Sequence, residues 1–160
     1  MNLFETTVLR NVGASDDAEV SNAILARAKV LGMTQDAEDA VLRPKDFGAF
    51  DHDLRAALAA RIAFLAGDEP LAAHYHANSK NYSALTSPSE KGISEGLDEV
   101  LSFVDKVANQ TKDIAAEDIS RLQASGVSDA DIVRLCELVA FMAFQTRVIA
   151  GLRLMQREAA

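Results

Sequence analysis

Apolar residues recur every three or four positions along almost the whole chain, which is the spacing of one face of an α-helix. The first run, with Val20 and Ile24, predicts a helix that begins at Asp16 after the N-cap Ser15 and ends before Gly32. Further helices are predicted over residues 35–42, 52–66, 97–109, 117–124 and 129–157, and another is predicted to begin at residue 69. Neither a strand-like alternation nor a heptad or solenoid repeat is evident. We therefore expect an all-α fold of six to seven helices in one domain spanning residues 1–160.

Two of the predicted helices have the composition of buried helices. In the helix over residues 52–66, Leu54, Leu58 and Ile62 lie on one stripe, and alanines fill most of the remaining surface. Small side chains let neighbouring backbones approach closely, so we expect other helices around this one. The helix over residues 129–157 contains the run Leu138–Phe144, which is apolar on all sides and predicts burial on several sides.

The segment over residues 78–96 interrupts the helical pattern. It is rich in Ser, Asn, Gly and Pro, the residues of turns and loops. We expect an irregular loop here, acting as a hinge between two helical halves of the domain. Within it, Ser87 and Glu90 flank Pro88 in the pattern of a capping box, which predicts the start of a helical turn.

Charge and composition exclude several classes of partner. The chain has 24 acidic against 16 basic residues and a net charge of −8. It gains no affinity from counterion release at a nucleic acid, and an anionic membrane surface repels it. The apolar run Leu138–Phe144 is far too short to span a bilayer, and the N-terminus lacks the pattern of a signal peptide. We predict a cytoplasmic protein, and the single cysteine rules out an internal disulfide.

Two separated blocks of the sequence resemble one known family. Residues 54–77 resemble the active-site helix pair of the alkylhydroperoxidase D-like family, also called the carboxymuconolactone decarboxylase family. Residues 97–109 and 128–152 resemble the C-terminal half of its peroxidase-related members, in which a long helix carries a Phe-x-x-Arg element matched here by Phe144 and Arg147. The resemblance covers residues 15–155. It implies the helical fold of that family and a homo-oligomer, a trimer or a hexamer.

The redox motif of the family is absent from this chain. That motif is Glu, eleven residues, Cys-x-x-Cys, three residues, His. Its positions fall on Ala56, Asp68, Leu71 and Tyr75, with His74 one residue too early. Peroxide reduction needs a thiolate and a second thiol that resolves the sulfenic acid, and neither residue at the cysteine positions supplies one. We therefore predict that peroxidase activity by this mechanism is absent, and no cofactor is implied.

The remaining polar residues of this region are the candidates for an altered site. Asp68 suits the N-cap of the helix that follows it, and the alternative is a general base or a metal ligand. His74 and Tyr75 are the other candidates for acid–base catalysis. On a helix His74 and His76 point about 200° apart, whereas two helical metal ligands should be three or four residues apart, so no metal site is predicted.

Two residues of the last predicted helix need an explanation. Arg147 lies on a mostly apolar helix, so it must be paired or reach a surface. It is either part of an ion pair or subunit interface, or, with Tyr75, an anchor for a carboxylate-bearing ligand. Cys136 lies among apolar residues and is predicted to be a small buried hydrophobe. The alternative is a reactive thiol, although Glu137 beside it would not activate one.

Three functions follow from these alternatives. The first is a non-peroxidatic family member, an oligomer that binds a small molecule or a partner subunit. The second is an enzyme with a rewired acid–base site, because the decarboxylase branch of the family acts on small lactones without a redox cysteine pair. The third is a peroxidase that uses Cys136 alone with an external thiol.

Overall fold

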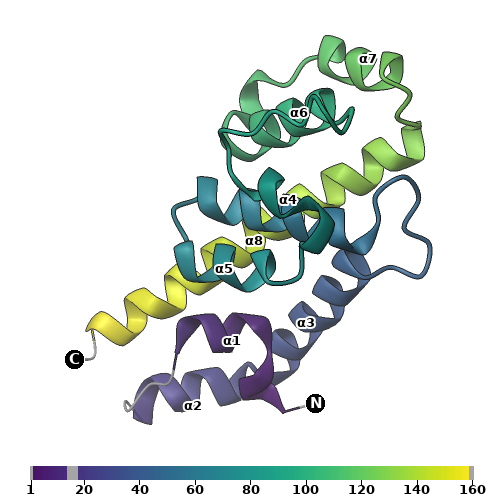
Figure 1. Cartoon of the computed structure of the whole chain (residues 1–160). Coiled ribbons are helices and arrows are strands. Elements are labelled where there is room, and N and C mark those ends of the chain that lie inside the picture. The colour runs from purple at the N-terminus through teal and green to yellow at the C-terminus, as the bar shows by residue number, and fades with distance from the viewer. Residues whose placement is uncertain (1, 14–17, 159–160) are drawn as a thin grey trace.

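The computed structural model describes residues 2–13 and 18–158 and contains only helices as regular elements in that part of the chain (Figure 1). This confirms the predicted all-α class. The α-helices are α1 (Thr7–Val12), α2 (Ala18–Ala26), α3 (Ala28–Leu42), α4 (His52–Leu65), α5 (Glu69–His76), α6 (Asp98–Asn109), α7 (Ala116–Ala124) and α8 (Asp129–Glu158). Three short 3-10 helices are η1 (Leu3–Glu5), η2 (Lys80–Thr86) and η3 (Thr111–Asp113). The eight α-helices among the described residues exceed the six to seven expected.

Helices α4 and α8 organise the fold. Helix α8 is 30 residues long and runs across the molecule, where it contacts α1, α3, α4, α6 and α7 (Figure 1). Helix α4 lies against α8 and also packs on α3, α5, α6 and η2. The two helices therefore join the N-terminal helices, α5 and the α6–α7 pair to one core.

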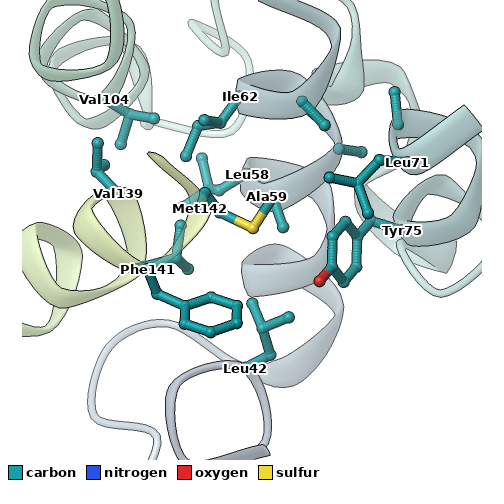
Figure 2. Packing of buried hydrophobic residues seen from close by; sticks show 14 of the residues in the cluster. Leu42, Leu58, Ala59, Ile62, Leu71, Tyr75, Val104, Val139, Phe141 and Met142 are labelled. Carbon is teal, nitrogen blue, oxygen red and sulfur yellow. The ribbon is translucent and has the colours of Figure 1, made fainter. Parts of the chain in front are cut away.

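The prediction that α4 is surrounded by other helices is confirmed. Every residue from Leu54 to Ala63 is buried, which a helix reaches only when neighbours cover all of its faces. Figure 2 shows Met142 of α8 and Tyr75 of α5 packed on different sides of it. The alanines of α4 make this possible, because a side chain of one carbon lets a neighbouring helix approach closely.

The N-terminal boundaries differ from the prediction. The predicted stop at Gly32 is wrong, because α3 continues through this glycine from Ala28 to Leu42. The break lies instead at Arg27, whose φ of −107° and ψ of 13° separate α2 from α3. Leu31, Thr34, Glu38 and Leu42 give α3 one continuous buried face, and these tertiary contacts outweigh the weak helix propensity of glycine. The predicted cap at residue 15 lies outside the described residues.

The segment over residues 78–96 is partly helical rather than fully irregular. It contains η2, and the expected helical turn at Ser87 is absent, since the chain there forms turns without a following helix. Arg61 of α4 secures this segment. Its side chain is fully buried and donates hydrogen bonds to the carbonyl oxygens of Leu85, Ser87, Pro88 and Glu90.

Helix α8 is unusually apolar for its length. Its stretch Asp129–Gln156 has a mean hydropathy of 1.5 over its most apolar 18-residue window, and only 39% of that window is buried. By length and composition alone this helix is able to cross a membrane, a property that core helices of soluble proteins share. The cytoplasmic location therefore stays a prediction.

Candidate functional site

Asp68 is the N-cap of α5, as the sequence predicts. Gly67 ends the preceding turn with a φ of +77°, a conformation that suits glycine, and places Asp68 at the start of the next helix. The Asp68 carboxylate accepts a hydrogen bond from the backbone N–H of Leu71 at 3.2 Å. This contact satisfies one of the amides that a helix leaves free at its N-terminus.

The same carboxylate is also bound by Arg153 of α8. The two terminal nitrogens of Arg153 lie 2.9 and 3.1 Å from the two Asp68 oxygens, a bidentate arrangement. Arg153 also donates to the backbone carbonyl of Asn11 in α1, at 2.7 and 3.1 Å. With a cap, an ion pair and little exposure, Asp68 is held as a structural group. Sequence reasoning missed Arg153 and considered only Arg147, six residues earlier on the same helix.

The other positions of the absent redox motif are in the core. Leu71 has no exposed surface, and Ala56 is also buried. Figure 2 shows Leu71 and Tyr75 on α5, both turned toward α4. An apolar side chain in close packing therefore fills the place where the resemblance puts the second thiol.

A chain of hydrogen bonds runs from Tyr75 through the core. The Tyr75 hydroxyl donates to Gln145 Oε1 of α8, Gln145 Nε2 donates to Glu38 Oε2 of α3, and the Thr7 hydroxyl of α1 donates to Glu38 Oε1, each at 2.7 Å. All four side chains are buried, and the Arg43 guanidinium lies 3.8 Å from the Glu38 carboxylate. Burial raises the pKa of Tyr75 far above its ordinary value, so this phenol stays protonated.

Three of these network residues were not identified from the sequence. Thr7, Glu38 and Gln145 come from three helices that are distant along the chain. The available signal was a polar residue at a core-facing position: Gln145 directly follows the apolar run of α8, and Glu38 lies on the buried face of α3 with Leu31 and Leu42. Periodicity marks such residues as buried, but it does not tell which of them meet.

His74 and His76 point in different directions, as their spacing predicts. His74 is half-buried, and its ring packs edge-on against Tyr75 with 5.0 Å between centroids. Burial lowers the pKa of His74, and the nearby Glu38 carboxylate opposes that shift only in part. His76 is exposed and bonds through Nδ1 to the Thr86 hydroxyl at 3.1 Å. Among the described residues no group of three His, Cys, Asp or Glu side chains is placed to hold a metal ion.

The predicted burial of Cys136 is wrong. The residue is exposed on α8, because the helix turns Leu135 and Val139 into the core and leaves position 136 outside. Partial desolvation, together with the charge of Glu137, raises the pKa of the Cys136 thiol. The thiolate, which is the nucleophile in peroxide reduction, is thus disfavoured at neutral pH.

Arg147 does not join the region around Asp68 and Tyr75. It is exposed, and one of its terminal nitrogens donates to the carbonyl of Ala143 in its own helix at 2.7 Å. It borders a shallow groove of about 270 Å³ between α4, α8 and the end of α6, where Ile62 and Ala66 are among the neighbours. Arg147 and Tyr75 therefore do not line one ligand site in this structure.

A larger groove than the one at Arg147 lies on the surface of α6. Its volume is about 660 Å³, which is within the range of small-molecule sites. Arg61 and Asp105 form its floor as an ion pair, with N–O distances of 2.5 and 2.6 Å. Lys91 and Lys106 line it together with Asp98 and other polar side chains. The groove is of mixed charge, and Ile93 and Leu101 are among the residues that line it.

Comparison with known proteins adds no assignment. No family model, no curated protein and no solved structure matches this chain. The likeness to the alkylhydroperoxidase D-like family therefore stays a prediction from the sequence. The chemistry of the site has to be inferred from its own geometry.

Proposed function

We propose that this chain is a non-peroxidatic protein on an alkylhydroperoxidase D-like helical scaffold. In this proposal it is a cytoplasmic homo-oligomer that acts by binding a small molecule or a partner subunit. The observation that supports it best is the set of hydrogen bonds that the Asp68 carboxylate accepts. This residue occupies the position of the first motif cysteine, and its carboxylate is engaged by Arg153 and by the N–H of Leu71.

The surroundings of Asp68 support the same conclusion. Leu71 fills the second cysteine position with a fully buried apolar side chain, and the hydroxyl of Tyr75 is committed to Gln145. Neither Asp68 nor Tyr75 lines any of three surface grooves of the described residues, which lie at Arg61, at Arg147 and at His76. For a small-molecule ligand, the groove over Arg61 and Asp105 offers more room than the grooves at Arg147 and His76.

A peroxide-consumption assay tests this proposal. The purified protein is incubated with cumene hydroperoxide and dithiothreitol, and peroxide loss is measured against a protein-free control and against Cys136→Ser. We expect both proteins to match the control. Consumption well above the control would overturn the proposal, and if Cys136→Ser abolished it, the activity would be that of a one-cysteine peroxidase.

One observation favours an acid–base enzyme as a second candidate. His74 is half-buried, its lowered pKa keeps the imidazole neutral at pH 7, and it contacts a protonated Tyr75. A neutral imidazole is able to accept a proton from a bound substrate, and the packing of its ring against Tyr75 holds it in place. A panel of small lactones, followed by ultraviolet absorbance, tests this candidate. Turnover that disappears in His74→Gln and persists in His52→Gln would favour it over binding.

A further inference from the structure

The two faces of α8 differ completely in their surroundings. One face is buried in the core through Leu135, Leu138, Met142 and Ile149. The opposite face carries eight residues that are all exposed, and we call this row the α8 seam: Ala130, Val133, Glu137, Ala140, Phe144, Arg147, Gly151 and Leu154. They are separated alternately by three and four residues along the whole helix. This is the spacing with which one helix contacts a second helix in a coiled coil.

The α8 seam is too apolar for a surface that faces only water. Its three large apolar side chains, Val133, Phe144 and Leu154, are 56%, 47% and 57% exposed. The remaining seam residues are small, apart from Glu137 and Arg147. The apolar and small residues of the seam are interrupted only by Glu137 and Arg147 and extend over about 36 Å, from the rise of an α-helix between the first and last seam residues. A surface of this kind is typical of one that a partner covers.

We propose that the α8 seam is the contact with a second copy of this chain, packed antiparallel about a two-fold axis at the level of Met142. In this register Glu137 lies opposite the partner's Arg147, and Arg147 lies opposite the partner's Glu137. Ala140 lies opposite the partner's Phe144, and Val133 lies opposite the partner's Gly151. At the ends Ala130 meets the partner's Leu154. Each pair thus joins an acid to a base or a small residue to a large one.

Charge complementarity selects this arrangement. Within the described part of the chain neither Glu137 nor Arg147 has an ion pair, and the Arg147 bond is to its own helix backbone. The antiparallel two-fold axis pairs each of them with the opposite charge. A parallel pair would instead place like charges opposite each other at both positions, which is unfavourable. The contact is closed and self-complementary, as two-fold symmetry requires.

Gly151 gives an independent indication of close approach. A side-chain carbon added at this glycine would meet no atom of another described segment within 4 Å, so no contact among the described residues requires a glycine here. Glycine in a helix interior costs about 0.5–1 kcal/mol relative to alanine. In the proposed dimer this position receives the partner's Val133, for which a larger side chain leaves no room.

The inference rests on the proposed function only in its oligomeric part. A negative result here would leave the absence of peroxidase activity untouched, and the peroxide assay does not depend on subunit contacts. A failure of the dimer proposal can therefore be distinguished from a failure of the proposed function. A lipid bilayer as the occupant of the seam is one of the outcomes of the same test.

Charge reversal tests the interface in the full-length protein. The wild type is expected to sediment at twice the 17.2 kDa mass of the chain, or as a larger even assembly, at tens of micromolar. Glu137→Arg alone and Arg147→Glu alone should each weaken association by about tenfold or more, because each puts like charges together at two symmetric places. The double variant restores both pairs and should associate nearly as the wild type does. Circular dichroism confirms that each variant remains helical.

A steric variant and a distance measurement complete the test. Gly151→Leu has open space in the single chain, so it should fold normally and yet fail to dimerise. A nitroxide on the exposed Cys136 should report a distance of about 20–25 Å across the antiparallel dimer, since the two sites lie 12 helical rises apart along the axis.

Several results would overturn the proposal. They are a monomer at tens of micromolar, a trimer, or an assembly that is indifferent to charge reversal and to Gly151→Leu. A monomer that becomes a dimer only in detergent or lipid would assign the seam to a membrane. A Cys136 distance below about 15 Å would show a parallel pair.

Discussion

Arg153 near the end of α8 binds Asp68 at the start of α5 through both of its terminal nitrogens, at 2.9 and 3.1 Å. It also donates to the carbonyl of Asn11 at the end of α1. Three helices that are far apart in the sequence therefore meet at one guanidinium. The carboxylate at this junction serves as cap for α5 and as counter-ion for α8, so its removal should disturb both helices.

Replacement of Asp68 should separate its two roles. We expect Asp68→Ala to lower the free energy of unfolding by about 2 kcal/mol, because the cap and the bidentate pair are both lost. Asp68→Asn keeps one capping oxygen for Leu71 N–H but replaces the other acceptor of Arg153 with an amide nitrogen and loses the charge, so it should cost less than Asp68→Ala. Urea unfolding followed by circular dichroism measures both. Asp51→Ala is the matched control, since Asp51 caps α4 through Leu54 N–H. An Asp68→Ala cost no larger than that of Asp51→Ala would show that Arg153 adds nothing.

The buried chain from Tyr75 to Glu38 should be sensitive to single changes. Tyr75→Phe removes the donor to Gln145 and leaves a buried amide oxygen without a partner, at a cost of about 1–3 kcal/mol. Gln145→Leu should cost more, because Tyr75 and the Glu38 carboxylate each lose a bond. Urea midpoints compare these variants with Tyr82→Phe, which changes a half-buried tyrosine whose hydroxyl has no buried side-chain partner among the described residues. Equal effects of Tyr75→Phe and Tyr82→Phe would contradict the role of the network.

The half-buried His74 should make stability depend on pH. Burial lowers its pKa in the folded protein below the 6.5 of an ordinary histidine. The unfolded chain then binds more protons than the folded one as the pH falls through 6.5 and below. The stability from the neutral imidazole is therefore present above pH 6.5 and is lost at lower pH. Urea unfolding at pH 7.5 and pH 5.5 should show a larger loss for the wild type than for His74→Gln. His52→Gln, which changes an exposed histidine, should behave as the wild type does.

The thiol of Cys136 should be accessible to reagents but should react with them slowly. Its side chain is exposed, yet desolvation and Glu137 raise its pKa, so little thiolate is present at neutral pH. We expect 5,5′-dithiobis(2-nitrobenzoate) to modify it at pH 7.5 more slowly than the cysteine of a short unstructured peptide, which serves as the free thiol. Glu137→Gln should speed the reaction. A rate above that of the free thiol would indicate an activated cysteine and would revive the one-cysteine peroxidase.

Much of the secondary structure follows from local sequence. The pattern predicts α4 as His52–Ala66, and the structure has His52–Leu65. It also gives Asp68 as the cap of α5, and α6, α7 and α8 within one or two residues. These features depend on residues only a few positions apart, where capping and apolar spacing act. The boundary at Arg27 was missed because the long buried face of α3, formed in the tertiary structure, carries the helix through Gly32.

The partners of the polar residues were decided by the tertiary structure alone. The sequence determined that the chain has a single cysteine and no Cys-x-x-Cys pair, that the fold is helical, and that α8 is apolar around Met142. It could not distinguish Arg147 from Arg153, because both are arginines on one helix and only the rotation of α8 against α4 and α5 turns one toward Asp68 and the other toward water. The same rotation buries Gln145 and exposes Cys136. Helical periodicity fixes which residues share a face, whereas the neighbour that a face meets depends on contacts between segments far apart in the chain.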